Sequence, residues 1–264
     1  MTVGFTLIEL SIVLIIIGLI VGGVLVGQDL INSARVRAQI KQFEDYKLAL
    51  NNFKLKYNCL PGDCSTATSF DLGSNGDNDG VLEMSSITAS VSNCTWITDN
   101  SYTTPDCNFN GEFPLFFQHL SASKMIAGSF DGTWVLGKGY PKVVIDESKG
   151  MIAAGAWHAG ESGTKPHYLR TTYNFPSGFW LHVNSCARIT DIGPEQGNDN
   201  CGILTPSQMQ QIDIKIDDGN PLKGIFWGYS GYWDAYPAFC LNAANTDYAV
   251  SANYAVCQAS YKMY

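Results

Sequence analysis

The sequence predicts an α+β protein: a long N-terminal helical rod, first transmembrane and then amphipathic, packed on an antiparallel-sheet head with disulfide-stapled loops. Three observations predict this fold. An apolar run near the N-terminus continues, with no proline before residue 61, into a segment of helical periodicity. Short apolar runs bounded by Gly, Pro, Lys or Ser follow it, and all eight cysteines lie after residue 58.

The composition excludes several classes of protein. Of the 264 residues, 45% are hydrophobic, 12% are aromatic and only 15% are charged. This is enough apolar side chain for a core, and it excludes a disordered tail, a collagen-like repeat and a nucleic-acid arm. The net charge of -8 argues against phosphate backbones and anionic lipid as surface partners. No nucleic acid is therefore expected to bind, and cations are the more natural ligands.

The first element is an apolar segment over residues 5–28, in which Glu9 is the single charge. As a helix rising ~1.5 Å per residue it would span about 36 Å, which is long enough to cross a bilayer. A secretory signal peptide would instead end in a small-x-small cleavage site after a shorter apolar core. A buried core helix would be shorter and would not be apolar all round. We therefore expect a transmembrane helix here.

The second element is an amphipathic helix over residues 29–58. Its apolar residues recur at spacings of three and four, with charged residues between them, so one stripe can pack on a globular domain. This stripe contains Val36, Ile40, Phe43, Tyr46, Leu50, Phe53 and Tyr57. Because no proline interrupts them, the two helical segments form one rod that ends at Leu60-Pro61-Gly62. Residues 59–264 then form the head.

Glu9 is the exception within the apolar segment. A carboxylate in the bilayer interior costs ~2.5 kcal/mol or more unless it is paired or lies near the interface. One interpretation places it at the interface with a snorkelling side chain. The other pairs it with a cation from another subunit.

The run Gly4-Phe5-Thr6-Leu7-Ile8-Glu9-Leu10 resembles the processing and methylation motif of type IV pilins and of the pseudopilins of type II secretion. The resemblance implies that residues 1–4 are a leader, which a prepilin peptidase/methyltransferase removes by cutting after Gly4. It also implies that Phe5 becomes the N-methylated first residue and that Glu9 meets the free amine of a neighbouring subunit. The apolar helix matches closely, and the rod to Tyr57 matches in pattern.

The resemblance also implies partners and a location. The partners are copies of the chain and other pilins, and an inner-membrane assembly platform. Before assembly the chain would cross the inner membrane once with its head in the periplasm. After assembly it would lie in an extracellular pilus or a periplasmic pseudopilus.

Two features depart from the family pattern. The leader lacks the usual basic residue, and Arg35, Arg37 and Lys41 fall on the side expected to be periplasmic, against the positive-inside tendency. The proline that the family often carries in the membrane half is also missing.

The function that this resemblance predicts is a structural subunit of a type IV pilus-like surface filament. Two alternatives stay open: a pseudopilin of a type II secretion system, and a minor tip pilin or adhesin. The adhesin alternative draws on the size of the head, which is large for a shaft subunit.

The cysteines favour disulfides in an oxidising compartment, because their number is even and they lie in Gly-, Asn- and Ser-rich sequence. A zinc site is the weaker interpretation, since there is no CxxC pair and no histidine at ligand spacing from a cysteine. Pairing each cysteine with its neighbour in the sequence closes the shortest loops and so costs the least chain entropy. It joins Cys59 to Cys64, Cys94 to Cys107, Cys186 to Cys201 and Cys240 to Cys257.

A Gly/Asp-rich loop after the rod suggests calcium, the one cofactor that the sequence indicates. Oxygen ligands at alternate positions suit this hard cation. The EF-hand-like positions one, three, five, seven and nine are held by Asn75, Asp77, Asp79, the carbonyl of Val81, and Glu83. Position twelve is Ser86 rather than a bidentate Glu. A plain Asx/Gly turn has much the same composition and is the alternative.

The rest of the head predicts two short helices and several strands. One helix runs from Glu112 through Met125. The other runs from residue 206 to about 216, behind an N-cap at Thr205 with Gln208 at the third helical position, which together form a capping box. The expected strands cover residues 134–136, 143–145, 151–153 and 178–183. The aromatic segment 225–264 resembles the disulfide-closed C-terminal loops of pilins.

The sequence gives no indication of an enzyme. Its histidines are scattered, and it has none of the common hydrolase, metalloprotease or nucleotide-binding motifs. The histidines are His119, His158, His167 and His182. Packing of these residues is the simpler interpretation. The aromatic residues Trp227, Tyr229, Tyr232, Trp233 and Tyr236 could bind sugar if exposed, but core packing is the stronger interpretation.

Overall fold

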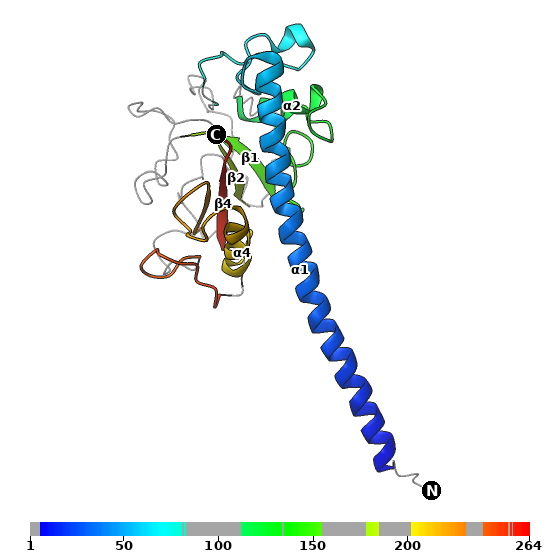
Figure 1. Cartoon of the computed structure of the whole chain (residues 1–264). Coiled ribbons are helices and arrows are strands. Elements are labelled where there is room, and N and C mark those ends of the chain that lie inside the picture. Colours follow the sequence, from blue (N-terminus) through cyan, green and yellow to red (C-terminus); the bar gives the residue numbers. More distant parts are fainter. Residues whose placement is uncertain are drawn as a thin grey trace, which may run out of the picture.

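The computed structural model describes residues 6–80, 82, 112–133, 135–154, 178–184, 202–230, 240–252, 254 and 256–264. These residues form the α+β fold that the sequence predicts. A long N-terminal helix, α1, packs with its C-terminal half against a head built on a four-stranded antiparallel sheet (Figure 1).

Helix α1 (Leu7–Tyr57) is one unbroken helix of 51 residues. Thr6 is the N-cap of α1, and Asn58 is its C-cap. The backbone of Asn58 is left-handed (φ 55°), and the Asn58 N–H donates to the Lys54 carbonyl, which closes the last turn. The predicted amphipathic stripe is confirmed: its members are buried against the head, apart from Ile40 and Tyr57, which are partly buried. The sequence therefore predicts both the length of the rod and the face that it buries.

The sheet contains β1 (Gly150–Ala154), β2 (Trp180–Asn184), β4 (Cys257–Lys262) and β3 (Phe226–Ser230), in the spatial order β1-β2-β4-β3. Every neighbouring pair is antiparallel. The alternation along β2 places Leu181 and Val183 in the core that contains the helix stripe. The ring of Phe43 on α1 packs against Phe226, with the ring centroids 6.0 Å apart, and against Tyr261, at 5.2 Å.

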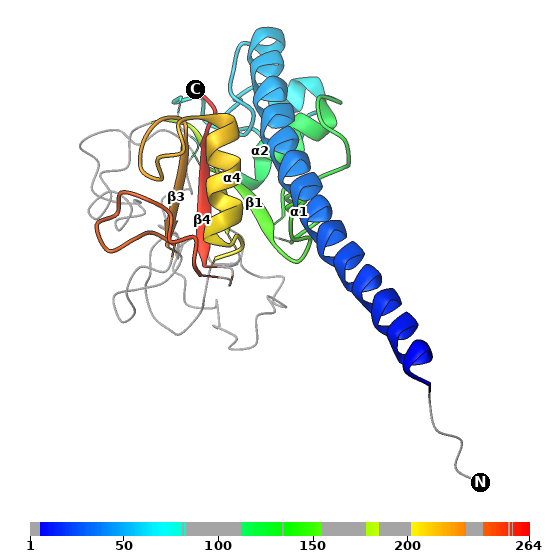
Figure 2. The ribbon, with the colours of Figure 1, turned by 60° about the horizontal axis from the view of Figure 1, so that its bottom comes forward.

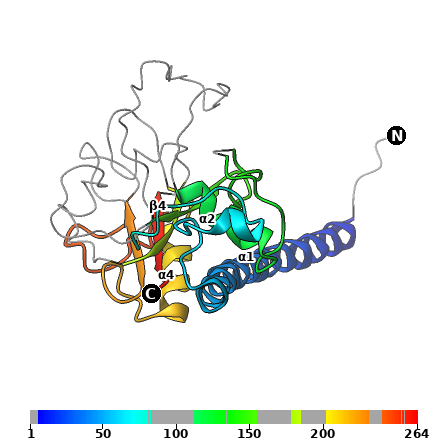
Figure 3. The ribbon, with the colours of Figure 1, turned by 90° about the horizontal axis from the view of Figure 1, so that it is seen from above.

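Two shorter helices complete the layer on α1's side of the sheet (Figures 2 and 3). Both were predicted. Helix α2 (Glu112–Ala122) ends three residues before the expected boundary at Met125. Helix α4 (Pro206–Ile216) begins with the predicted capping box, in which the Thr205 hydroxyl accepts from the N–H of Gln208 at 3.2 Å.

Two disulfides are present in the described part of the chain. Cys59–Cys64 ties the end of α1 to the turn that follows it, and Cys240–Cys257 closes a loop onto the start of β4. These are two of the four pairs that neighbour pairing predicts. The other four cysteines, Cys94, Cys107, Cys186 and Cys201, lie outside the described residues.

The C-terminal strand is also held by lysines of α1. The ammonium of Lys54 lies 4.0 Å from the ring centroid of Tyr264, and that of Lys47 lies 5.1 Å from the ring of Tyr261. Lys47 Nζ also donates to the Lys262 carbonyl at 3.4 Å. Cation–π contacts thus join the polar flank of α1 to the chain end.

Two strand predictions are wrong. Residues 143–145 form no strand, because their backbone amides donate to side chains of α1: Ile145 N–H to Gln39 Oε1 and Val144 N–H to Gln42 Oε1, both at 3.3 Å. Residues 135 and 136 enter a turn instead of a strand, and Trp134 lies outside the described residues. In the first case polar side chains of the rod replace the neighbouring strand.

The segment 225–264 was expected to be loops, yet it supplies β3 and β4, half of the sheet. Only its middle part is a disulfide-closed loop. The strands were missed because β4 reads Cys-Gln-Ala-Ser-Tyr-Lys, which is too small and polar for an apolar run.

The packing of α1 predicts a contrast between two of its residues. Replacing the fully buried Phe43 by Ala should lower the free energy of unfolding by ~3–5 kcal/mol, because it leaves a cavity between α1 and the sheet. The control Leu48→Ala, at a side chain that is 61% exposed, should change it by less than ~0.5 kcal/mol. Urea unfolding of the full chain in detergent measures both. Equal losses would contradict the packing described here.

Candidate functional site

The N-terminal half of α1 has no partner within the described chain. Among the described residues, α1 is the one helix long and apolar enough to cross a membrane, and no side chain of its most apolar stretch is buried. Large exposed apolar side chains run from Leu7, at 88% exposed, to Ile31, at 54%. This half projects away from the head (Figure 1). By length and composition it suits a membrane anchor or a signal sequence.

Glu9 lies in the first turn of α1, where it forms a capping box with Thr6. Its carboxylate accepts hydrogen bonds from the Thr6 N–H at 2.8 Å and from the Thr6 hydroxyl at 2.7 Å. The Thr6 hydroxyl in turn accepts from the Glu9 N–H at 3.4 Å. In the single chain the carboxylate is therefore held locally, at the exposed tip of the rod. Gly4 and Phe5, the predicted processing residues, lie outside the described residues.

The glycines of the apolar half lie on an open helical surface. No atom outside the local helix lies within 4 Å of the point where a Cβ would stand on Gly18, Gly22, Gly23 or Gly27. The spacing of Gly18 and Gly22, and of Gly23 and Gly27, allows the backbone of another helix to approach closely. The single chain leaves these positions unused.

The Gly/Asp-rich loop folds around side chains of the head. Asn75 Oδ1 accepts from the Thr68 N–H at 2.8 Å, and Asp77 Oδ1 accepts from the Asp79 N–H at 3.1 Å. The second is the local bond of an Asx turn, the alternative to a calcium loop, and the first ties the loop to a residue seven positions earlier. Val81 and Glu83 lie outside the described residues, so the calcium loop stays a prediction.

Beside this loop lies Asp63, which is not one of the predicted calcium ligands. Its carboxylate accepts from the backbone N–H groups of Asp79 at 3.1 Å and Gly80 at 3.0 Å. Burial raises the pKa of Asp63 to about 6, against the opposing effect of the amide donors. Glu112 Oε1 accepts from the Asp77 N–H at 2.9 Å. Oxygens of Asp63, Asp77 and Glu112 lie within 4.8 Å of one another, so these residues could hold a cation.

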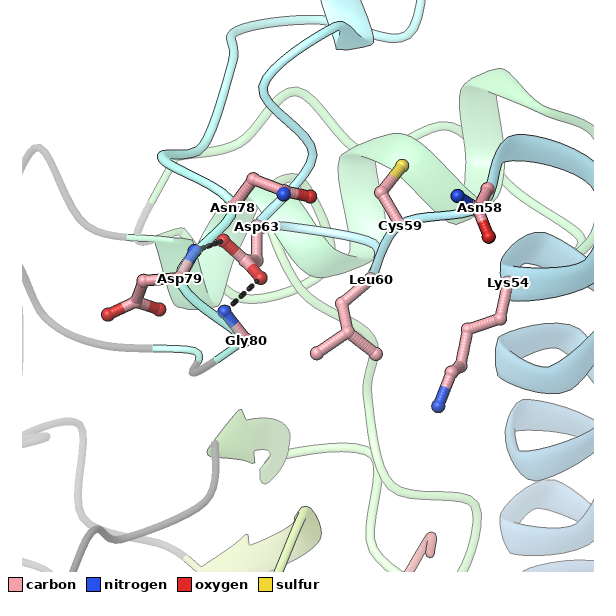
Figure 4. A pocket seen from close by; sticks show the side chains of 8 residues that line it. All are labelled: Lys54, Asn58, Cys59, Leu60, Asp63, Asn78, Asp79 and Gly80. Atoms are coloured by element: carbon pink, nitrogen blue, oxygen red, sulfur yellow. Dashed lines mark hydrogen bonds between the residues drawn. The ribbon is translucent and has the colours of Figure 1, made fainter.

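A pocket of about 310 Å³ opens beside Asp63, between the end of α1 and the loop (Figure 4). Lys54 and Leu60 line one part of it, and Asp79 and Gly80 line the other. Figure 4 shows the Asp79 carboxylate pointing away from Asp63, whose own oxygens face the loop amides. The lining thus contains charges of both signs and no arrangement that selects one ligand.

His119 on α2 is a fully buried residue that fixes the turn after α1. Its Nδ1 accepts from the Gly62 N–H at 2.8 Å, and its Nε2 lies 2.8 Å from the Ser74 carbonyl oxygen. This pattern requires the neutral ring with its proton on Nε2. Burial lowers the pKa of His119, and its ring stacks on Phe53. Both ring nitrogens contact backbone groups, so His119 holds the backbone at Gly62 and Ser74 in place.

His182 is likewise packed. It faces Ser260 across the sheet, with His182 Nδ1 2.6 Å from the Ser260 hydroxyl, and burial lowers its pKa to about 4. Trp227 and Tyr229 are buried, which confirms core packing for these two residues and excludes them from an exposed sugar-binding surface. The remaining candidates, His158, His167, Tyr232, Trp233 and Tyr236, lie outside the described residues.

Taken together, the described residues define a pilin-like architecture: a long apolar N-terminal helix whose second half packs on an antiparallel sheet, with disulfides in the head. No protein-family model, curated protein or solved structure matches the chain. The architecture is therefore established by the fold of this chain alone.

The environment of His119 predicts a pH effect on stability. Because the pKa of the folded ring is lowered, its stabilising contribution is complete above the unfolded value of ~6.5 and is lost as the pH falls below it. The variant His119→Leu lacks this titration and has no acceptor for the Gly62 N–H. At pH ~8 it should be less stable by ~1–3 kcal/mol, the cost of an unpaired Gly62 N–H. Urea unfolding should show that the difference in the free energy of unfolding between the wild type and the variant becomes smaller as the pH falls to ~5. A difference that does not change with pH would contradict the assignment of a neutral His119 ring.

Proposed function

We propose that this chain is a structural subunit of a type IV pilus-like filament, stored in a membrane by the N-terminal half of α1 and polymerised through that half. One observation carries the proposal. A single unbroken helix has a first half that is apolar and exposed, and a second half that is the centre of the head's core. Such a helix needs one environment for each half, and the described part of the chain supplies only the second.

Lipid is the first of two environments that suit the exposed half, because a helix satisfies its own backbone in a bilayer. The second is a bundle of like helices, in which close packing replaces contact with lipid tails. The open glycine positions at 18, 22, 23 and 27 favour such packing. Assembly would therefore exchange one apolar environment for another.

In this proposal Glu9 selects the partner in the bundle. A carboxylate among packed apolar helices is tolerated only when a cation neutralises it. The free α-amine of a processed neighbour is positively charged at neutral pH and could reach this position at the helix tip. In the single chain Thr6 holds the same oxygens, so the capping box would yield to the stronger charge-assisted bond.

The role proposed for the head is display and mechanical durability rather than catalysis. The two described histidines of the head support this role, since His119 and His182 are buried and hydrogen-bonded within the fold. The disulfides Cys59–Cys64 and Cys240–Cys257 brace the two ends of the head sequence, as suits an oxidising compartment.

Mass spectrometry of the mature protein tests the processing step. We expect the loss of residues 1–4 and one added methyl group on Phe5. An N-terminus that still carries Met1 would contradict the proposal, because no free amine would then stand four residues before Glu9.

The variant Glu9→Val tests the assembly step. Membrane insertion should persist, because the substitution makes the helix more apolar. Fibre yield should fall at least tenfold, because a charged hydrogen bond is worth ~1.5–3 kcal/mol. The control Glu44→Val removes an exposed carboxylate from the head-bearing half and should leave fibre yield unchanged. Unchanged yield in Glu9→Val would refute the pairing role.

A further inference from the structure

Two arginines on α1 stand where the free half of the rod meets the head. Arg35 and Arg37 are exposed, and they flank Val36, the first side chain of α1 that is buried against the head. In the described part of the chain neither forms an ion pair, whereas nearby Lys41 binds Asp45 at 2.7 Å. We call Arg35 and Arg37 the arginine collar. The filament role proposed above makes no use of it.

The collar lies on both sides of the rod. Successive residues of an α-helix are ~100° apart, so Arg35 and Arg37 stand about 100° to either side of Val36. Val36 faces the head, so one guanidinium flanks each side of the contact. A neighbouring protein would touch one side of the rod first, whereas a bilayer surrounds it. The placement therefore suits a lipid surface.

The height of the collar also suits a lipid surface. The run of large exposed apolar side chains that starts at Leu7 ends at Ile31, and at ~1.5 Å per residue the Cα atoms of Arg35 and Arg37 lie about 6 and 9 Å further along the axis. The headgroup layer extends roughly 5–7 Å beyond the hydrocarbon on each side. Helical side chains tilt toward the N-terminus, which here is toward the bilayer. Both guanidiniums can therefore reach the phosphates.

The collar lies in a basic segment of a chain whose net charge is negative. Residues 29–58 contain six lysines and arginines against three acidic residues, while the rest of the chain contains ten against twenty-one. An acidic head close to an anionic membrane is repelled by it. Basic side chains between the two would offset that repulsion, because a guanidinium pairs with phosphate through two parallel hydrogen bonds.

We propose that the arginine collar binds the phosphates of anionic lipid headgroups and so fixes the depth of the rod in the membrane before assembly. This inference rests on the proposed function, because it requires the apolar N-terminal half of α1 to lie in lipid. It assigns the membrane-facing end of the amphipathic half a specific ligand class. The net charge alone argues against such a ligand.

The test uses the full chain in vesicles made of equal parts phosphatidylcholine and phosphatidylglycerol. Native mass spectrometry after gentle detergent extraction gives the ratio of the two lipids that stay bound. We expect the wild type to retain phosphatidylglycerol, and the double variant Arg35→Gln/Arg37→Gln to lose about thirtyfold of this preference, roughly fivefold for each arginine. The charge-preserving variant Arg35→Lys/Arg37→Lys should keep most of it.

The matched control is Lys41→Gln on the same helix. Its ammonium is paired with Asp45, and its Cα lies about 15 Å beyond Ile31, so the lipid ratio should not change. An unchanged ratio in Arg35→Gln/Arg37→Gln would overturn the inference. So would loss of fibre assembly in that variant with normal lipid retention, which would assign the collar to contacts between copies. A wild-type chain that fails to insert into vesicles would instead overturn the proposed function.

Discussion

The structure depends on one constraint: a single helix has to satisfy two different surroundings along its length. The change occurs at Val36, where the first side chain of α1 becomes buried. Beyond it, each turn of the helix contributes to the core of the head through residues such as Phe43 and Phe53. Before it, large apolar side chains stay exposed in the single chain. The free energy that stabilises the head therefore also fixes an unsatisfied apolar rod in a defined direction.

The head is organised to keep that rod in place at its far end. The Cys59–Cys64 disulfide and the bond from Gly62 to His119 fix the turn that follows α1. Gly62 has a φ of +94°, and a Cβ there would lie 2.8 Å from the Glu112 carbonyl oxygen, so the turn requires glycine. Lys54 holds the chain end from the other side. Force applied along α1 would thus reach both ends of the head sequence.

How far the sequence predicted the structure depends on the range of the interactions. The rod, its buried stripe and the capping box of α4 follow from local periodicity and residue type, and they were predicted. The central strand β4 was not, because it is defined by its neighbours β2 and β3 rather than by its own small, polar residues. Asp63 and His119 were missed as organising residues for the same reason, since their partners are distant in sequence. The run Leu60-Pro61-Gly62-Asp63 was the available signal for Asp63.

In the proposed function, the exposed half of α1 is stored in lipid and then packed among copies of itself. Electron cryo-microscopy of the assembled material tests it most directly. We expect a filament whose axis is formed by the apolar N-terminal halves of α1 from many subunits, with the heads outside. Filaments in which these residues lie on the outer surface, or a protein that stays dispersed as single membrane-bound chains under assembly conditions, would contradict it.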